Sequence, residues 1–353
     1  MNTYIPNTEN VKSLGRTYLL ENTLWLTLSG SGAAFDFHGT KASVTFLGDS
    51  IATKPGYESN LSRIAVYVNG TRVVDDRINE AKKEYVIFES EQAQDCHVEI
   101  IKLSEAAMST VGIQSISADA ENGIHPAALK PHYVEFIGDS ITCGYGVDDE
   151  VIEHTFTTGT EDVTKAYAYL TAMALDADFS FVSLSGYGII SGYIEEGEPK
   201  KEDQALPPYY DKLAYSEGEY LGKIPEDVEW DFKRQPDLIV VNLGTNDDSY
   251  TQNHPDRQEE YRTAYVDFLK LVRSKNPHAK ILCTLGIMGD RLFPVIEKAV
   301  EAYSTETQDR NIATMKFDEQ LPEDGYTVDW HPTAATHKKA ASKLAAKVRE
   351  LLY

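Results

Sequence analysis

A serine, a glycine and an asparagine each stand shortly after an apolar run, and a histidine stands just before the last amphipathic stretch of the chain. These residues are Ser140, Gly186, Asn246 and His331. A serine hydroxyl becomes a nucleophile when a base takes its proton, and histidine is the usual base near neutral pH. The backbone N–H groups of Ser140 and Gly186 and the Asn246 side-chain amide are candidate donors to the oxyanion of a tetrahedral intermediate. The set predicts nucleophilic acyl-transfer chemistry.

Each of these residues also has a purely structural interpretation. Ser140 or its neighbour Asp139 can simply cap a helix, and Gly186 alone is most often a turn glycine. Asn246 after a strand often forms an Asx turn or a helix cap. Cys143, three residues after Ser140, is a rival nucleophile, although a small buried helix residue is its expected role.

His331 stands out among the nine histidines because of its local sequence. Pro332 fixes the backbone directly after it, and an amphipathic helix follows. His337 lies inside that helix, and we expect its ring to be solvated. His125 and His132 lie in a linker region and have no partner motif.

Short apolar runs alternate with amphipathic stretches from about residue 131 onward. We expect strands at 133–137, 179–184, 237–243, 280–285 and 312–317. We expect helices at 162–175, 257–274, 293–303 and 333–352. This alternation predicts a parallel sheet covered by helices on both faces, with the ligand crevice outside the carboxyl ends of the strands. Residues 194–232 are acidic, aromatic and poorly periodic, so we expect a long surface excursion near that crevice.

Residues 11 to about 120 have the alternating pattern of short β-strands. Expected strands cover 24–28, 33–37, 42–47, 64–68, 85–88, 97–101 and 113–116. Asn69-Gly70 is the strongest hairpin signal in the chain, and the whole pattern predicts a jelly-roll β-sandwich. The polar, turn-rich stretch 119–126 is expected to be a linker, which gives a β-sandwich domain at 1–125 and a second domain at 126–353.

The β-rich part contains a near copy of the serine motif. Phe46-Leu-Gly-Asp-Ser-Ile51 nearly repeats Phe136-Ile-Gly-Asp-Ser-Ile141. Thr53-Lys-Pro-Gly56 follows the first copy, which suits a turn between antiparallel strands rather than the start of a helix. We therefore expect Ser50 to be a structural turn residue.

The composition excludes several classes of partner. The formal net charge of −23 at pH 7 disfavours nucleic acid and anionic membrane surfaces, whereas a neutral sugar carries no such penalty. Three cysteines without paired spacing predict neither a disulfide framework nor a cysteine zinc site. The N-terminus lacks the features of a signal peptide and no apolar run reaches the roughly 18 residues of a membrane span, so we expect a cytoplasmic protein. The sequence leaves the oligomeric state open.

Four short motifs resemble the sequence blocks of the SGNH (GDSL-like) hydrolases, in that family's order. They are Gly138-Asp-Ser140, the Gly186 turn, Gly244-Thr-Asn246-Asp247 and Asp329-Trp-His331-Pro332. Longer matches at 138–146, 183–189 and 243–247 are similar to one branch, the carbohydrate esterase family 2 acetyl esterases, which also carry an N-terminal β-sandwich. The resemblance implies a flavodoxin-like α/β/α fold with a parallel sheet for the second domain, and it implies no metal or cofactor.

The resemblance also implies a role for each residue. Ser140 would be the nucleophile and His331 the base, with Gly186, Asn246 and the Ser140 amide forming the oxyanion hole. The implied substrates are acetylated xylo- or gluco-oligosaccharides or plant polysaccharide, deacetylated through an acyl-serine intermediate. The alternatives are another ester activity, such as that of a lipase or thioesterase, and a non-catalytic carbohydrate-binding protein.

One position departs from the family pattern. The family places its acid three residues before the histidine, where this chain has Val328, and the acid here is Asp329, two residues before. We expect Asp329 to be the third catalytic member unless a backbone carbonyl, such as that of Trp330, orients His331 instead. Three aromatic side chains are candidates for contact with sugar, although packing is an equally good interpretation of each: Trp330, Trp230 and Tyr187.

Overall fold

The chain is divided between two structural units in a computed structural model that describes residues 1–352. The first unit contains Met1–Lys130, Phe156–Glu161 and Lys212–Glu229. The second contains Pro131–Thr155, Asp162–Asp211 and the chain from Trp230 onward. Two later segments therefore belong to the first unit, whereas a boundary between residues 125 and 126 assigns them to the second domain.

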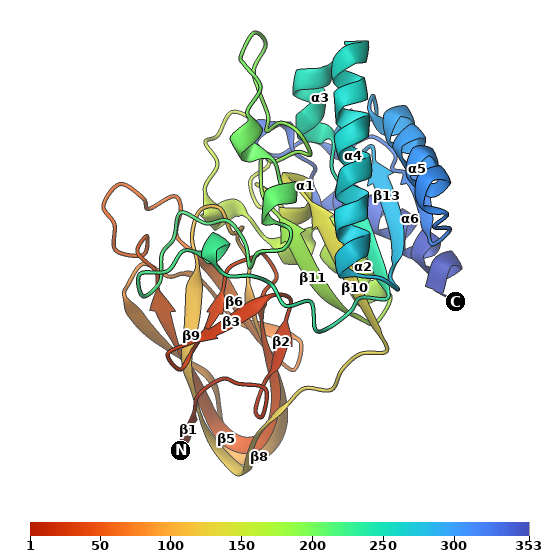
Figure 1. Cartoon of the computed structure of the whole chain (residues 1–353). Coiled ribbons are helices and arrows are strands. Elements are labelled where there is room, and N and C mark those ends of the chain that lie inside the picture. The colour runs from red at the N-terminus through yellow and green to blue at the C-terminus, as the bar shows by residue number, and fades with distance from the viewer. Residues whose placement is uncertain (353) are drawn as a thin grey trace. The chain divides into compact units, whose positions relative to one another are not determined.

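The first unit is built from antiparallel strands. They are β1 (Asn2–Tyr4), β2 (Lys12–Leu14), β3 (Thr17–Leu20), β4 (Thr23–Leu26), β5 (Gly32–Gly48), β6 (Arg63–Val68), β7 (Thr71–Arg77), β8 (Lys82–Lys102) and β9 (Val111–Pro126). Their order is β3-β4-β9-β5-β8-β6-β7, with β1 paired to β9 and β2 to β5. Figure 1 shows this unit with its long strands β5, β8 and β9. The hairpin predicted at Asn69-Gly70 is confirmed, because β6 pairs with β7 across these two residues, whose φ angles are 50° and 77°.

Apolar side chains of the long strands form the core of this unit. Strand β5 contributes Phe35, Phe37, Val44 and Phe46 to this core, and residues 32–35 and 42–46 of the strand are buried throughout. The register of β5 against β8 and β9 shifts around residues 39–42. Such bulges bend a strand and allow a sheet to curve around its own core. The antiparallel β-sandwich predicted for this region is confirmed.

The stretch 119–126 is a strand rather than the predicted linker. It forms the last part of β9, where Asp36 pairs with His125 and Phe37 with Ile124. Ile124 is buried whereas its polar neighbours are more exposed. A strand with one solvated face has much of the composition of a loop, and this made the sequence misleading here.

The copy of the Gly-Asp-Ser motif in the first unit has a turn conformation. Asp49 accepts hydrogen bonds from the backbone N–H groups of Ile51 and Ala52 at 2.9 and 3.3 Å. The Ser50 hydroxyl accepts one from the Glu219 N–H at 2.9 Å, and residues 50–53 form a turn. The prediction that Ser50 is a structural turn residue is confirmed.

A five-stranded parallel sheet lies at the centre of the second unit. Its strands are β10 (His132–Gly138), β11 (Ala177–Ser183), β12 (Leu238–Asn242), β13 (Lys280–Leu285) and β14 (Ile312–Lys316), in the order β11-β10-β12-β13-β14. Every residue of β11 and β12 is buried, as expected for a sheet covered on both faces. The strand order reverses between β11 and β12 on either side of β10, which is the switch point where open α/β sheets bind ligands. The predicted flavodoxin-like fold is confirmed.

Helices cover this sheet. They are α1 (Ser140–Cys143), α2 (Tyr167–Ala174), α3 (Thr245–Thr251), α4 (Pro255–Lys275), α5 (Phe293–Thr307) and α6 (Ala334–Leu352). Helix α2 packs against α6, and α4 packs against α5. The crossovers from β10 to β11 and from β12 to β14 run in opposite directions across the sheet, so right-handed connections place α2 and α4 on opposite faces. The sheet is thereby buried, and its carboxyl edge remains available for a site.

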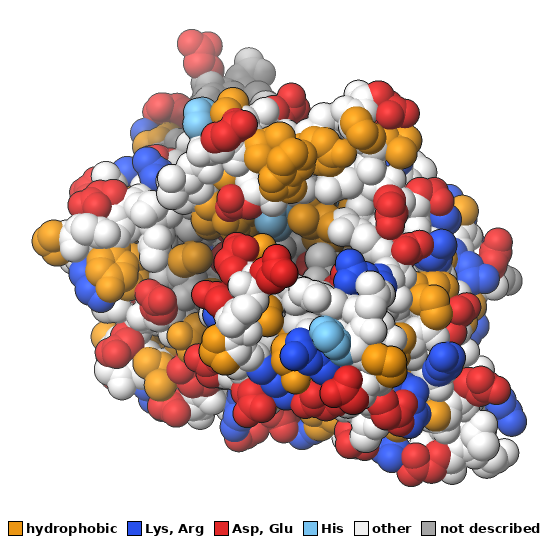
Figure 2. All heavy atoms as spheres, turned by 90° about the horizontal axis from the view of Figure 1, so that it is seen from above, with side chains coloured by type: hydrophobic (Ala, Val, Ile, Leu, Met, Phe, Trp, Pro, Cys, Tyr) orange, Lys and Arg blue, Asp and Glu red, His pale blue; other side chains and the backbone are white. Residues whose placement is uncertain are grey.

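Acidic side chains are prominent on the molecular surface. Figure 2 shows them distributed over one face, in line with the formal charge of −23. Within residues 1–352, none of the helices combines the length and apolar character needed to cross a membrane. Cys96, Cys143 and Cys283 are buried, and in the described part of the chain none of them forms a disulfide.

Candidate active site

Ser140 opens helix α1 at the carboxyl end of β10. The helix is capped by Asp139, whose Oδ1 accepts a hydrogen bond from the Ile141 N–H at 3.0 Å. Gly138 is required by packing, because a Cβ there would lie 2.1 Å from Thr142 Oγ1. Capping is therefore the task of Asp139, and the Ser140 hydroxyl is available for another contact.

That contact is with the imidazole of His331. Ser140 Oγ and His331 Nε2 are 2.9 Å apart, although 191 positions separate the two residues in the chain. Ser140 is the first residue of α1, just after strand β10, and His331 lies in the segment between β14 and α6. This is the geometry that a base needs in order to take a proton from a hydroxyl group.

Backbone carbonyls hold the second ring nitrogen of His331. Its Nδ1 lies 3.2 Å from the carbonyl oxygens of both Val328 and Asp329. Because a carbonyl only accepts, Nδ1 carries the proton and Nε2 presents its lone pair to Ser140. Asp329 and Trp330 have positive φ angles of 52° and 62°, and this tight turn brings two carbonyls to one nitrogen.

The Asp329 carboxylate has a different partner. Its Oδ2 accepts a hydrogen bond from the Tyr145 hydroxyl at 2.8 Å, and the contact of Asp329 with Nδ1 is made by its main-chain oxygen. The Trp330 carbonyl, which we named as the alternative, accepts a hydrogen bond from Gln320 Nε2 at 2.9 Å. Asp329 stands one residue later than the acid of the family pattern, so its side chain points in another direction. The main-chain carbonyls of Val328 and Asp329 contact the His331 ring instead.

Burial lowers the pKa of His331 to about 4, and the two carbonyls and the charge of Asp329 counteract this only in part. The Tyr145 ring covers the imidazole, with 4.3 Å between ring centroids. The histidine is therefore neutral near neutral pH, which is the form that accepts a proton.

Gly186 and Asn246 follow β11 and β12, the two strands that pair with the serine strand β10. Gly186 has a φ angle of 81°, and a Cβ at this position would meet open space, so backbone conformation alone requires glycine. The Asn246 Nδ2 donates to the Tyr187 carbonyl at 2.8 Å, and the amide has a second hydrogen for another acceptor. The sheet thus places both residues at strand ends next to that of Ser140.

Asp247 anchors the loop that follows Gly186. Its buried carboxylate accepts hydrogen bonds from the backbone N–H groups of residues 189–191 at 2.7 to 3.2 Å. Burial raises its pKa to about 6, although these donors favour the charged form. The pKa of Asp139 is raised to about 7 by burial, and the charge of Asp247 adds to this effect. The sequence indicated only a turn or cap at Asp247. Its role as an anchor depends on tertiary structure, because the three amides that it binds belong to another segment of the chain.

The candidate sugar-contacting aromatics have different environments. Tyr187 is buried and packs edge-on against Tyr209, which favours the packing interpretation. Trp230 is partly buried. Trp330 is 58% exposed and is supported by an edge-on contact with Tyr326 at 5.2 Å.

One exposed aromatic residue was missed from the sequence. Tyr193 is 49% exposed, and its backbone N–H donates to the Gly186 carbonyl at 2.9 Å. Burial and then Glu195, whose carboxylate accepts a hydrogen bond from the Tyr193 hydroxyl at 3.1 Å, raise the pKa of Tyr193. It lies in the poorly periodic excursion, where no local pattern distinguishes it from other tyrosines.

Two other residues near the site were considered from the sequence. Cys143 is buried and its Sγ donates to Ser183 Oγ at 3.2 Å, in keeping with a small helix residue. His337 is fully buried, so the expectation of a solvated ring was wrong. Its Nδ1 accepts a hydrogen bond from the Tyr167 N–H at 3.1 Å, and burial lowers its pKa to about 3. It lies on the inner face of α6, where α6 packs against α2.

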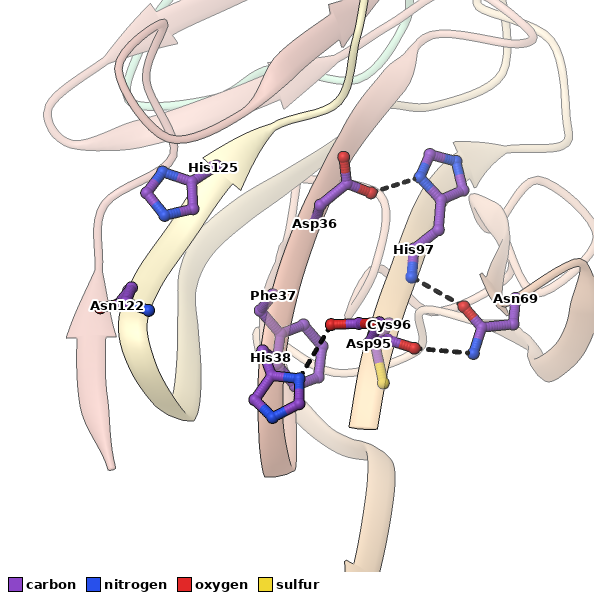
Figure 3. A pocket seen from close by; sticks show the side chains of 10 residues that line it. Asp36, Phe37, His38, Asn69, Asp95, Cys96, His97, Asn122 and His125 are labelled. Atoms are coloured by element: carbon purple, nitrogen blue, oxygen red, sulfur yellow. Dashed lines mark hydrogen bonds and ion pairs between the residues drawn. The ribbon is translucent and has the colours of Figure 1, made fainter. Parts of the chain in front are cut away.

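A hollow of about 440 Å³ lies on the sheet of the first unit (Figure 3). Two of its three histidines pair with carboxylates across neighbouring strands: His97 Nδ1 lies 2.6 Å from Asp36 and His38 Nδ1 lies 2.8 Å from Asp95. In the described part of the chain, no three His, Cys, Asp or Glu side chains are grouped so that they could hold a metal ion. These polar groups are therefore paired with one another, and we assign the hollow no part in the chemistry of Ser140.

Two family models match the chain. Residues 136–339 match the GDSL-like Lipase/Acylhydrolase family, and residues 13–127 match the carbohydrate esterase 2 N-terminal domain. Because the first match covers more than half of the chain, this protein belongs to the GDSL-like lipase/acylhydrolase family. Together the two matches give the domain organisation of carbohydrate esterase family 2, as the motifs predicted.

Named relatives point the same way. The chain is 31% identical over 334 residues to the cellulase/esterase CelE of Acetivibrio thermocellus, a match that covers 92% of this chain and 37% of CelE. It is 25% identical over 347 residues to an acetylxylan esterase / glucomannan deacetylase of Cellvibrio japonicus, covering 97% of this chain and 89% of that protein. The chain thus spans little more than a third of the length of CelE and most of the length of the Cellvibrio relative.

Solved structures share the fold over nearly the whole chain. The acetyl xylan esterase Est2A from Butyrivibrio proteoclasticus has a TM-score of 0.88 at 24% identity, with 99% of this chain and 98% of Est2A covered. A family two carbohydrate esterase from Clostridium thermocellum in complex with cellohexaose has a TM-score of 0.80 at 26% identity, with 97% and 99% covered.

Proposed function

We propose that this protein is a serine esterase that removes O-acetyl groups from acetylated xylo- or gluco-oligosaccharides or from plant polysaccharide. The observation that carries the proposal is the 2.9 Å contact between Ser140 Oγ and His331 Nε2, with Nδ1 held by two carbonyls. The names of the relatives, cellulase/esterase and acetylxylan esterase / glucomannan deacetylase, support the substrate class.

Ser140 and His331 act as a dyad in this proposal. His331 accepts the hydroxyl proton while Ser140 Oγ attacks the acetyl carbonyl carbon. The N–H groups of Ser140 and Gly186 and the Asn246 amide receive the charge that develops on the carbonyl oxygen. His331 then returns the proton to the departing sugar oxygen, and the acetyl group stays on Ser140. His331 then takes a proton from a water molecule, which attacks the acyl carbon. As the bond to Ser140 Oγ breaks and acetate leaves, His331 returns this proton to Oγ and the free enzyme is restored.

The exposed rings of Trp330 and Tyr193 are the proposed sugar contacts. Trp330 is 58% exposed and belongs to the turn that holds His331. Tyr193 is 49% exposed, and its backbone N–H donates to the carbonyl of Gly186. An aromatic ring offers an apolar face to a ligand and, in tyrosine and tryptophan, a polar group at its edge. Such rings suit a pyranose ring better than they suit a long acyl chain, which needs an enclosed apolar pocket.

Acetate release from acetylated xylan and glucomannan fragments tests the proposal. Ser140→Ala should lower kcat by about 10⁴-fold or more, since the nucleophile is lost. Ser50→Ala is the matched control, because Ser50 occupies the same Gly-Asp-Ser sequence in a turn of the first unit. It should leave kcat within twofold of the wild type. Undiminished acetate release by Ser140→Ala would refute the assignment, and faster hydrolysis of octanoyl than of acetyl esters would favour a lipase.

A further inference from the structure

Tyr145 lies between the serine motif and the histidine turn. It follows Ser140 by five residues in the loop after α1, and its backbone N–H donates to the Ser140 carbonyl at 3.2 Å. The glycines on either side have φ angles of 80° and 62°. A Cβ on Gly146 would lie 2.2 Å from Val328 Cγ1, so this loop packs directly against the turn that carries His331.

The Tyr145 side chain makes two contacts with that turn. Its ring packs against the imidazole of His331, with 4.3 Å between centroids and 31° between planes. Its hydroxyl donates to Asp329 Oδ2 at 2.8 Å. One side chain therefore limits the tilt of the imidazole and also holds the residue whose carbonyl accepts from Nδ1.

The turn needs such support because its backbone is unfavourable. Asp329 and Trp330 occupy the left-handed region consecutively, at φ angles of 52° and 62°, and residues other than glycine rarely do so. On one side, the Trp330 carbonyl accepts from Gln320 Nε2. On the other side, the Tyr145 hydroxyl bonds the Asp329 carboxylate, which is the stronger kind of hydrogen bond because the acceptor is charged.

We propose that Tyr145 is a positioning residue for His331, which it holds in the Nδ1–H tautomer by packing on the ring and by fixing Asp329 through its hydroxyl. The proposal rests on the proposed function, in which His331 is the base. In this proposal the Asp329 side chain makes no hydrogen bond to the imidazole. The Asp329 carbonyl accepts the hydrogen bond from Nδ1, and the negative charge of the carboxylate stabilises the imidazolium that forms during the reaction. The same charge raises the pKa of His331 against the effect of burial.

Within residues 1–352, few titratable groups act on the imidazole or contact it. Asp329 is the charged group that acts on it, and Tyr145 and Ser140 contact it directly. On the side of α6, His337 is coupled to it electrostatically and has its own pKa lowered to about 3, so it is neutral at neutral pH. Removing the Tyr145 hydroxyl therefore removes its hydrogen bond to Asp329 and alters no other charged group beside the imidazole.

The test combines kinetics with the tautomer of His331. Tyr145→Phe keeps the ring and removes the hydroxyl. It should lower kcat for acetate release about tenfold and leave KM within twofold of the wild-type value. The tenfold loss corresponds to the free energy of one charge-assisted hydrogen bond. In the Asp329→Ala background the same substitution should change kcat by less than twofold, because the acceptor is already gone. The matched control is Tyr303→Phe, which removes another tyrosine hydroxyl that donates to an aspartate, Asp309, at 2.8 Å. It should leave kcat unchanged.

Two-bond ¹H–¹⁵N correlation spectra of protein labelled in histidine report the tautomer directly. The His331 signals, assigned from their absence in His331→Gln, should show Nδ1–H alone in the wild type and in Tyr303→Phe. They should show mixed or exchange-broadened signals in Tyr145→Phe. Support requires both the kinetic and the tautomer result, and any other combination overturns the proposal. If Ser140→Ala kept full activity, the proposed function would fail, whereas the spectra would still show whether Tyr145 holds the ring.

Discussion

The pH dependence of catalysis follows from the burial of His331. Its pKa of about 4 lies well below the ordinary value of 6.5. This difference means that the protein environment disfavours the charged imidazole, relative to water, by about 3 kcal/mol. Because the pKa is lowered, the neutral base persists as the pH falls, and protonation begins to remove activity only as the pH approaches 4. We therefore expect kcat/KM in the free enzyme to stay within twofold between pH 5.0 and 7.5.

An ordinary histidine would behave differently in the same range. With a pKa of 6.5, the neutral fraction at pH 5.0, and with it kcat/KM, would be about thirtyfold below the plateau. The assay is chromatographic measurement of acetate released from an acetylated xylo-oligosaccharide at low substrate concentration. Enzyme held at pH 5.0 and returned to pH 7 should recover full activity, which separates titration from unfolding. Burial also raises the pKa values of Asp139 and Asp247 to about 7 and about 6. A fully reversible acid limb between pH 6 and 7 that persists in Asp139→Asn and in Asp247→Asn would therefore refute the reasoning from the burial of His331.

Two further predictions concern the loop glycine and the first unit. Gly186→Ala should lower kcat by about 10²-fold by displacing an oxyanion donor. It should also destabilise the fold by about 1 kcal/mol because the φ angle of Gly186 is 81°, and no clash adds to this cost because the new Cβ meets open space. Gly197→Ala, with a φ angle of 87° and equally open surroundings, is the control and should cost similar stability in thermal unfolding without a loss of kcat. In the first unit, Glu99 and then Asp36 raise the pKa of His97. That contribution to stability is present below the unfolded pKa near 6.5 and is lost as the pH rises through the higher folded value. The difference in unfolding free energy between wild type and His97→Gln should therefore shrink between pH 6 and 8, by less than about 1 kcal/mol because solvent screens the half-exposed ring; an increase over that range would contradict it.

Local sequence was sufficient for the parts of the site that are fixed by strand ends. Apolar runs followed by Gly138-Asp139, by Gly186 and by Gly244 encode strand-to-turn transitions through short-range rules of periodicity and glycine conformation. A parallel sheet brings such ends to one edge, so the amino-acid pattern alone predicts that Ser140 and Asn246 lie near each other. The motif order indicated the same family that the family models match.

Only the tertiary structure decided what surrounds His331. Two consecutive positive φ angles at Asp329 and Trp330 turn the carbonyls of Val328 and Asp329 toward Nδ1, and no propensity predicts such a turn at residues other than glycine. Part of the support for that turn comes from the hydroxyl of Tyr145, more than 180 residues earlier in the chain. The sequence by itself therefore determined which residues are candidates for the chemistry, because short-range rules fix the strand ends, whereas long-range packing of one loop against another decided how the His331 ring is held.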